Sequence, residues 1–143
     1  MNADALEFVD TNILVYAHSA SAGAKRKGAI ALIERLWRDE RAAISLQVLH
    51  ELNVVLTQRV RPPIPAGEVV KLVSDLAEWK VHEPRVEDTI PTLAIHRRHR
   101  VSLWDALILR SASVLGCAVL WSEDLQDGRT YDGVTVRNPF RTS

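Results

Sequence analysis

The sequence is poor in cysteine and has no excess of either charge sign. It contains a single cysteine, and its 18 Lys and Arg residues equal its 18 Asp and Glu residues. Cys117 cannot form a disulfide within the chain, and its apolar neighbours predict a small buried hydrophobe. No Cys–His spacing typical of a zinc site is present. A net charge of zero excludes nucleic-acid binding through bulk charge, so any such binding requires local basic patches.

Long hydrophobic runs are also missing. No apolar stretch is long enough to cross a bilayer, and residues 1–5 lack the basic and apolar regions of a signal peptide. We therefore expect a cytoplasmic protein that does not associate with membranes. The content of 47% hydrophobic and 25% charged residues is ordinary for a globular protein. A chain of 143 residues without repeats or linkers predicts one domain over residues 1–143.

Short apolar runs alternate along the chain with amphipathic stretches. The apolar runs predict strands at 6–9, 42–46, 79–82, 118–121 and 134–136. Apolar residues at helical spacing predict helices at 13–17, 25–40, 47–59, 69–78 (with a start allowed after Pro65), 86–100 and 102–115. Strands that alternate with helices are typical of a parallel sheet covered on both faces. The pattern therefore predicts an α/β fold.

Two aspartates follow predicted strands. Asp10 comes directly after the first strand, and Asp124 lies three residues after the strand at 118–121. Ligands of open parallel sheets bind outside the carboxyl ends of the strands, so both acids stand where a site is expected. Taken singly, each also fits an ordinary turn or helix N-cap aspartate.

Two further acids lie on predicted helices. Glu51 shares a helix side with Val48 and Val55, where a carboxylate loses hydration unless a cation or hydrogen-bond donors compensate. The alternative for Glu51 is a boundary residue that reaches solvent or pairs with an arginine. Asp105 stands three residues after Ser102, as in a capping box, so capping is an alternative to a role in a site.

Four acids that converge on one point require a cation. Like charges about 4 Å apart repel by ~4 kcal/mol at an effective dielectric constant near 20, and a divalent ion removes that repulsion. Oxygen ligands without cysteine or histidine favour Mg²⁺ or Mn²⁺ over zinc. Such an ion activates water and stabilises the charge that develops on a phosphate. The predicted chemistry is phosphodiester hydrolysis.

The same motifs, taken in order, resemble a known family, the PIN domain. They are Asp10-Thr11-Asn12 after the first strand, Glu51 in the helix after the second, Trp104-Asp105-Ala106 at a helix start and Ser122-Glu123-Asp124 after a late strand. Within that family the chain is similar to the VapC-type toxins of toxin–antitoxin pairs, also in its segments 124–128 and 136–140. The resemblance implies a three-layer α/β/α fold with a central, mostly parallel sheet, and a Mg²⁺-dependent endoribonuclease.

The resemblance also implies roles for individual residues. The implied catalytic acids are Asp10, Glu51, Asp105 and Asp124, with Asp10, Asp105 and Asp124 as metal ligands and Glu51 acting through water. Asn12 and Ser122 match positions that support the acids by hydrogen bonding. Asp127 matches an occasional fifth acid, and a plain turn residue before Gly128 is its alternative. The implied partners are an RNA substrate, a second copy in a homodimer, and a VapB-type antitoxin whose arginine pairs with the acids.

Candidate RNA contacts lie close to Asp105 in the sequence. The run at 96–100 is the densest basic segment, and Arg97, Arg98 and Arg100 are its predicted phosphate contacts. A solvated helix end, where cations complement the helix dipole, is the alternative. Trp104 is a candidate for stacking on a base, with core packing or a dimer contact as alternatives. His18, His50 and His82 share no spacing and are predicted to be incidental surface or boundary residues.

Two other functions fit parts of the pattern. A non-catalytic RNA- or protein-binding module on the same fold would bind without metal-dependent turnover, but the presence of all four acids argues against it. A phosphatase with Asp10 as nucleophile usually has a second aspartate two residues later, and Asn12 stands there instead. The absence of that second acid favours a metal ligand over a nucleophile as the role of Asp10.

Overall fold

A six-stranded sheet forms the centre of the protein. The structure, a computed structural model, describes residues 5–141. The sheet order is β3-β2-β1-β4-β6-β5, and every neighbouring pair is parallel except β5 and β6. The strands are β1 (Glu7–Val9), β2 (Ala42–Ser45), β3 (Lys80–His82), β4 (Val119–Trp121), β5 (Thr130–Tyr131) and β6 (Val134–Arg137). The predicted α/β class with a mostly parallel sheet is confirmed.

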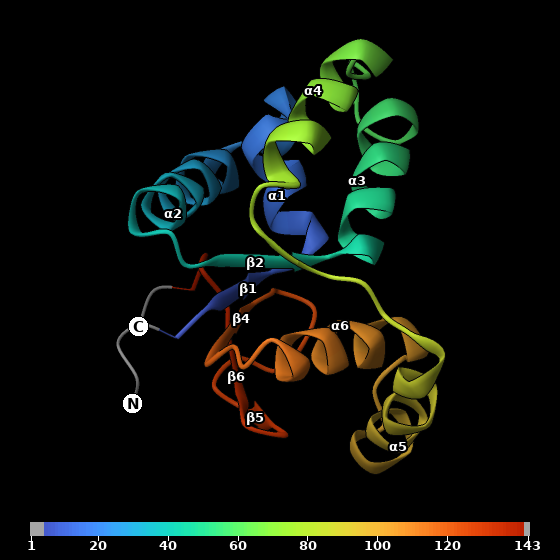
Figure 1. Cartoon of the computed structure of the whole chain (residues 1–143). Helices are drawn as coiled ribbons and strands as arrows, with labels where there is room; N and C mark the ends of the chain where they lie inside the picture. Colours follow the sequence, from blue (N-terminus) through green and yellow to red (C-terminus); the bar gives the residue numbers. More distant parts are fainter. Residues whose placement is uncertain (1–4, 142–143) are drawn as a thin grey trace.

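Helices cover both faces of this sheet. They are α1 (Thr11–His18), α2 (Ala24–Asp39), α3 (Leu46–Gln58), α4 (Ala66–Leu76), α5 (Thr89–His99) and α6 (Leu103–Val114), with single 3₁₀ turns η1 (Ala20–Ala22) and η2 (Val86–Asp88). Helices α1 to α4 lie on one side of the sheet, and α5 and α6 lie on the other (Figure 1). The three-layer arrangement is therefore confirmed. Within residues 5–141, no helix has the length and apolar character needed to span a membrane.

The core lies where the central strands meet the two helical layers. Phe8, Ile44, Leu120 and Val136, one from each of four neighbouring strands, have no more than a trace of exposed surface. Strands that are covered on both faces are apolar along their whole length, which explains the short hydrophobic runs of the sequence. Cys117 precedes β4 and is buried, as predicted for a small hydrophobe.

Two segments differ from the elements predicted for them. The helix expected over 86–100 begins as η2 and becomes α5 only at Thr89. The side chain of Asp88 accepts a hydrogen bond of 2.8 Å from the backbone N–H of Arg85, which holds the start of this segment in a tight turn. Strand β5 was not predicted. It pairs with β6 and is connected to it by Asp132 and Gly133, whose positive φ angles of 49° and 86° suit a two-residue hairpin turn.

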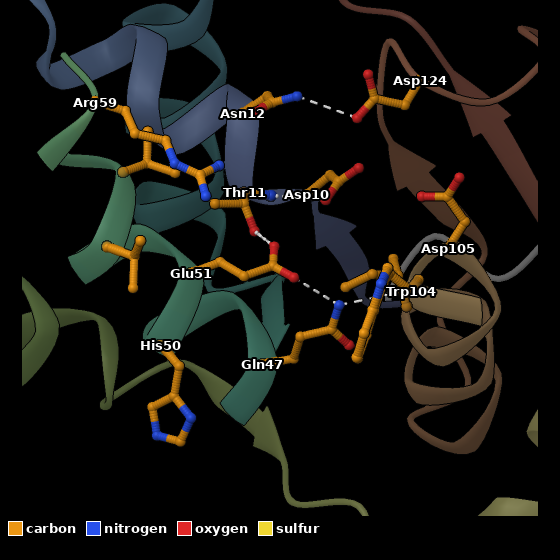
Figure 2. A pocket seen from close by; sticks show the side chains of 13 residues that line it. Asp10, Thr11, Asn12, Gln47, His50, Glu51, Arg59, Trp104, Asp105 and Asp124 are labelled. Atoms are coloured by element: carbon orange, nitrogen blue, oxygen red, sulfur yellow. Dashed lines mark hydrogen bonds between the residues drawn. The ribbon is translucent and has the colours of Figure 1, made fainter. Parts of the chain in front are cut away.

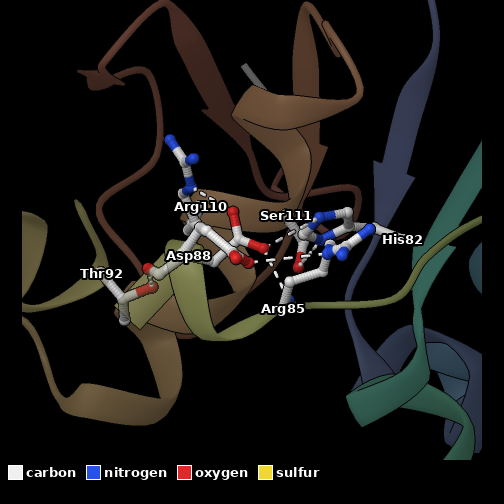
Figure 3. Close-up of polar contacts among 7 residues, drawn as sticks. His82, Arg85, Asp88, Thr92, Arg110 and Ser111 are labelled. Carbon is white, nitrogen blue, oxygen red and sulfur yellow. Dashed lines mark hydrogen bonds and ion pairs between the residues drawn. The ribbon is translucent and has the colours of Figure 1, made fainter. Parts of the chain in front are cut away.

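A buried polar network joins β3 and η2 to α6 (Figure 3). The Nδ1 atom of His82 lies 2.7 Å from the hydroxyl oxygen of Ser111, and its Nε2 atom lies 3.7 Å from the carboxylate of Asp88. That carboxylate also pairs with Arg110 at 2.9 Å. Burial lowers the pKa of His82 and favours its neutral form. His82 is therefore a buried structural residue, and its prediction as a surface or boundary histidine is wrong.

Candidate active site

The strand order changes direction at β1. Strands β2 and β3, which follow β1 in the sequence, lie on one side of it, and the later strands β4 and β6 lie on the other. The carboxyl ends of β1 and β4 therefore flank a switch point, the place where open α/β sheets bind ligands. A cavity of about 520 Å³ opens there. It is lined by Asp10, Thr11, Asn12, Gln47, His50, Glu51, Val54, Val55, Arg59, Trp104, Asp105, Ile108 and Asp124 (Figure 2).

Asp10 lies at the bottom of this cavity. It is the N-cap of α1, and its backbone N–H donates to the carbonyl of Trp121 on β4 at 3.0 Å. Its carboxylate accepts hydrogen bonds from the Ser122 hydroxyl at 2.9 Å and the Thr11 N–H at 2.8 Å. Only 7% of the residue is exposed. Burial, reinforced by Asp124 and Asp105, outweighs the two hydrogen bonds and raises the pKa of Asp10 to about 7.

Asp124 is held beside Asp10 by two supporting residues. Ser122, which is fully buried, accepts a hydrogen bond of 3.1 Å from the Asp124 N–H while its hydroxyl donates to Asp10. Asn12 donates to the Asp124 carboxylate at 3.1 Å. Burial and the charges of Asp105 and Glu123 raise the pKa of Asp124. Ser122 thus fixes the positions of both acids through one hydroxyl group.

A second cluster, which the sequence analysis missed, anchors the loop that carries Asp124. Glu123 accepts hydrogen bonds from the Tyr16 hydroxyl and from Lys25 Nζ, the latter at 2.7 Å. Burial alone would raise the pKa of Glu123, but Lys25 and Tyr16 outweigh it and lower the value. The Tyr16 ring packs edge-on against Phe140 at 5.5 Å. The loop after β4 is therefore attached to α1 and α2 next to the cavity.

Glu51 projects from α3 into the same cavity and is hydrogen-bonded through both oxygens. The Thr11 hydroxyl donates to one carboxylate oxygen at 2.7 Å, and Gln47 Nε2 donates to the other at 2.7 Å. These donors compensate the hydration that a carboxylate loses beside an apolar stripe. Glu51 is therefore a fixed part of the cavity wall and not a side chain that reaches freely into solvent.

Asp105 combines a capped backbone with an unpaired carboxylate. Its N–H donates to the hydroxyl of Ser102, the N-cap of α6, at 3.0 Å. Within residues 5–141 its carboxylate makes no hydrogen bond or ion pair. The capping interaction thus uses only the backbone of Asp105, and its charge stays available at the cavity.

The acids fit a divalent cation by the chemistry of their donors. The side chains of Asp10, Asp105 and Asp124 face a common space in Figure 2. All three donors are carboxylate oxygens, the ligands that Mg²⁺ and Mn²⁺ prefer. As placed in the described part of the chain, no three His, Cys, Asp or Glu side chains are close enough to hold a metal ion. Direct ligation by all three carboxylates would therefore need their side chains to reorient.

Some predicted site residues lie outside the cavity. Asp127 accepts a hydrogen bond of 2.8 Å from the Asn138 N–H and does not line the cavity. Arg97, Arg98 and Arg100 belong to the end of α5, where Arg98 pairs with Asp132 at 3.2 Å. The cationic side chain that does line the cavity is Arg59, at the end of α3. A single arginine after a helix gives no signal in the sequence, so this residue was missed.

Residues 8–130 match the family model of the PIN domain. The chain belongs to the PIN domain family. Solved structures with the same fold include a toxin–antitoxin complex from Klebsiella pneumoniae, with a TM-score of 0.71 and 20% identity over 95% of this chain and 99% of that one. The comparison with curated proteins finds no significant match.

Two other solved structures also share the PIN fold of this chain. VapC20 of Mycobacterium tuberculosis, described as a sarcin-ricin loop cleaving toxin, matches with a TM-score of 0.64 and 20% identity over 82% of this chain and 91% of that one. FitAcB from Neisseria gonorrhoeae matches with a TM-score of 0.62 and 14% identity over 96% of this chain and all of that one. At these identities the structures demonstrate a shared fold, which agrees with the family match.

Proposed function

We propose that this PIN domain is a metal-dependent endoribonuclease and the toxin of a toxin–antitoxin pair. The observation that carries the proposal is the buried Asp10, which faces Asp105 and Asp124 in a cavity at the switch point of the sheet. Burial and neighbouring negative charge disfavour the ionised form of Asp10 in the absence of a cation. A divalent ion would remove this penalty for all three acids together.

The chain's own residues divide the work of this site. Asp10, Asp105 and Asp124 would hold Mg²⁺, with Mn²⁺ as a substitute, and the cation would supply Lewis-acid activation of water and phosphate. Ser122 and Asn12 orient two of these carboxylates by hydrogen bonds. Glu51, fixed by Thr11 and Gln47, acts on the opposite wall through a water molecule.

The partners follow from the same site. We assign RNA as the substrate, cleaved in the cytoplasm, with Arg97, Arg98 and Arg100 as contacts to its backbone outside the cavity. The acidic cavity suits the guanidinium group of an antitoxin arginine, because such pairs form strong charge-assisted hydrogen bonds. A toxin–antitoxin complex among the similar structures supports this partner. A homodimer completes the proposal.

An Asp10→Asn variant tests the proposal. We expect wild-type protein to cleave RNA with Mg²⁺, to lose this activity in EDTA and to inhibit growth when expressed. The Asp10→Asn variant should show neither effect while its circular dichroism spectrum stays that of wild type. Asp75→Asn, an exposed aspartate on α4, serves as the matched control and should behave as wild type. Unchanged cleavage by folded, metal-loaded Asp10→Asn protein would reject the proposal, and RNA binding without turnover by wild type would favour a binding module.

A further inference from the structure

Trp104 is an exposed aromatic residue on the wall of the acidic cavity. It lies in the first turn of α6, directly before Asp105, and 64% of its surface is exposed. Its side chain lines the same cavity as Asp10 and Asp124. Core packing, one of the interpretations of this residue from sequence, therefore does not apply.

The backbone of Trp104 is connected through Gln47 to one acid of the opposite wall, Glu51. Gln47 Nε2 donates to the Glu51 carboxylate at 2.7 Å and makes a longer contact of 3.4 Å with the Trp104 carbonyl. In Figure 2 the indole ring stands beside Gln47 at the side of the cavity formed by α6. Gln47 thus links α3 to α6 beside the indole ring, through the Glu51 carboxylate and the Trp104 backbone carbonyl.

A cation stands on the side of the cavity away from Trp104. Arg59 extends from the end of α3 toward Thr11, and its guanidinium group has no ion pair within residues 5–141 (Figure 2). The cavity therefore combines three kinds of group: carboxylates, a guanidinium on one side that has no ion pair within residues 5–141, and an exposed aromatic face on the other. These groups match, in turn, a divalent cation, a phosphate and a nucleobase.

We propose that the cavity takes one unpaired nucleotide, with its base stacked on Trp104 and a neighbouring phosphate on Arg59. This inference rests on the proposed nuclease function and assigns Trp104 and Arg59 as two further RNA contacts of its site. A base inside a duplex stacks on its neighbours and offers no free face to a protein ring, whereas splayed bases of loops and single strands do. The cavity volume of about 520 Å³ suits a ligand of this size.

Binding measurements with matched variants test this assignment. The probe is a fluorescein-labelled single-stranded RNA, measured by anisotropy with protein that carries Asp10→Asn to prevent cleavage. Adding Trp104→Ala should weaken binding at least fivefold, because base stacking on an aromatic residue contributes about that much or more. Trp104→Phe should retain most of the affinity. Leu103→Ala changes an exposed neighbour in the same turn that does not line the cavity, and it should bind as the parent does.

A blunt RNA duplex and tryptophan fluorescence provide the remaining readouts. The duplex should bind all variants equally, and single-stranded RNA should quench tryptophan emission in the parent but not in Trp104→Phe. Equal single-strand affinity of Trp104→Ala and parent would overturn the inference, as would an equal loss for duplex and single strand. Dissociation of a dimer by Trp104→Ala with unchanged RNA affinity would assign Trp104 to a subunit interface instead. Absence of metal-dependent cleavage by wild type, with the stacking result intact, would reject the nuclease function alone.

Discussion

At the scale of single residues, one buried hydroxyl group forms hydrogen bonds with two of the site acids. Ser122 donates to Asp10 and accepts from the Asp124 backbone, and no part of its surface is exposed. Loss of a group that orients a metal ligand in this way typically lowers metal affinity by about 10- to 100-fold. We therefore expect the proposed metal binding to be sensitive to Ser122, a residue that would not itself be a ligand.

Ser122→Ala should raise the Mg²⁺ concentration needed for half-maximal cleavage by about 10- to 100-fold. The variant removes the hydrogen bond that holds the Asp10 carboxylate, and it leaves all four acids in place. The measurement is RNA cleavage over a Mg²⁺ titration. Ser113→Ala removes the same group near the other end of α6, away from the cavity, and should leave the titration unchanged. Identical titrations for both variants would contradict the orienting role of Ser122.

The raised pKa of Asp10 predicts that the free energy of unfolding of the metal-free protein depends on pH. Folded Asp10 keeps its proton up to about pH 7, whereas the unfolded chain releases it near pH 3.8. The folded state therefore binds more protons across this window, and the free energy of unfolding falls as pH rises through it. The loss is complete above about pH 7 and amounts to at most about 4 kcal/mol.

Asp10→Asn should lack this contribution. In urea unfolding with EDTA, the variant should gain stability relative to wild type between pH 5 and pH 8. Adding Mg²⁺ at pH 8 should stabilise wild type and leave the variant unchanged, because the cation binds only the folded carboxylate site. A constant difference between the two proteins across this pH range would show that Asp10 titrates normally.

The sequence identifies some site residues and not others for a physical reason. Asp10 stands directly after an apolar run and Asp124 three residues after another, so their place beyond strand ends follows from local pattern. Lys25 and Glu123 meet across 98 positions, and Arg59 reaches the cavity only because α3 packs beside α1. Contacts of this kind depend on the tertiary arrangement, which no local pattern contains.

At the scale of elements, most helix and strand boundaries follow from hydrophobic periodicity. The 3₁₀ turn η2 differs because Asp88 accepts a short-range hydrogen bond from the Arg85 N–H. The two residues of β5 are too few to form a hydrophobic pattern, although the Asp132-Gly133 turn that follows is a hairpin signal. His82 ends β3, and no residue near it in the sequence indicates its hydrogen-bond partner. Its partner, Ser111, comes from α6 on the far side of the segment 83–102.

Ser111→Ala tests the network that joins β3 to α6. The variant leaves Nδ1 of the buried His82 without a partner, so the free energy of unfolding should fall by about 1–3 kcal/mol. Urea denaturation measures the change. Ser113→Ala, two residues along the same helix, makes no hydrogen bond through its side chain within residues 5–141 and should cost much less. A smaller loss for Ser111→Ala than for Ser113→Ala would contradict the structural role of the network.

At the scale of the whole molecule, charge is balanced but unevenly distributed. Equal numbers of cationic and anionic side chains give no bulk attraction for RNA. The acids gather in the cavity, and basic residues gather at the end of α5. RNA binding should therefore depend on few phosphate contacts and show a shallow dependence on salt.

Arg97→Ala and Arg100→Ala should each reduce the slope of log affinity against log salt by about 0.7 for single-stranded RNA. Arg98→Ala should have a smaller effect, because Arg98 is already paired with Asp132. Anisotropy titrations over a range of salt concentrations provide the slopes. Lys71→Ala on α4 removes an exposed cation that forms no ion pair within residues 5–141, and it serves as the control. Equal slopes of log affinity against log salt for wild type and all variants would show that this basic run does not contact RNA.

The proposed function requires Asp10, Asp105 and Asp124 to bind one divalent cation. Calorimetric titration of Mn²⁺ into wild type and into the three single Asp→Asn variants tests it most directly. The proposed site predicts one saturable binding event in wild type, lost or at least tenfold weaker in every variant and retained in Asp75→Asn. Mn²⁺ binding of equal affinity in wild type and the three site variants would contradict it.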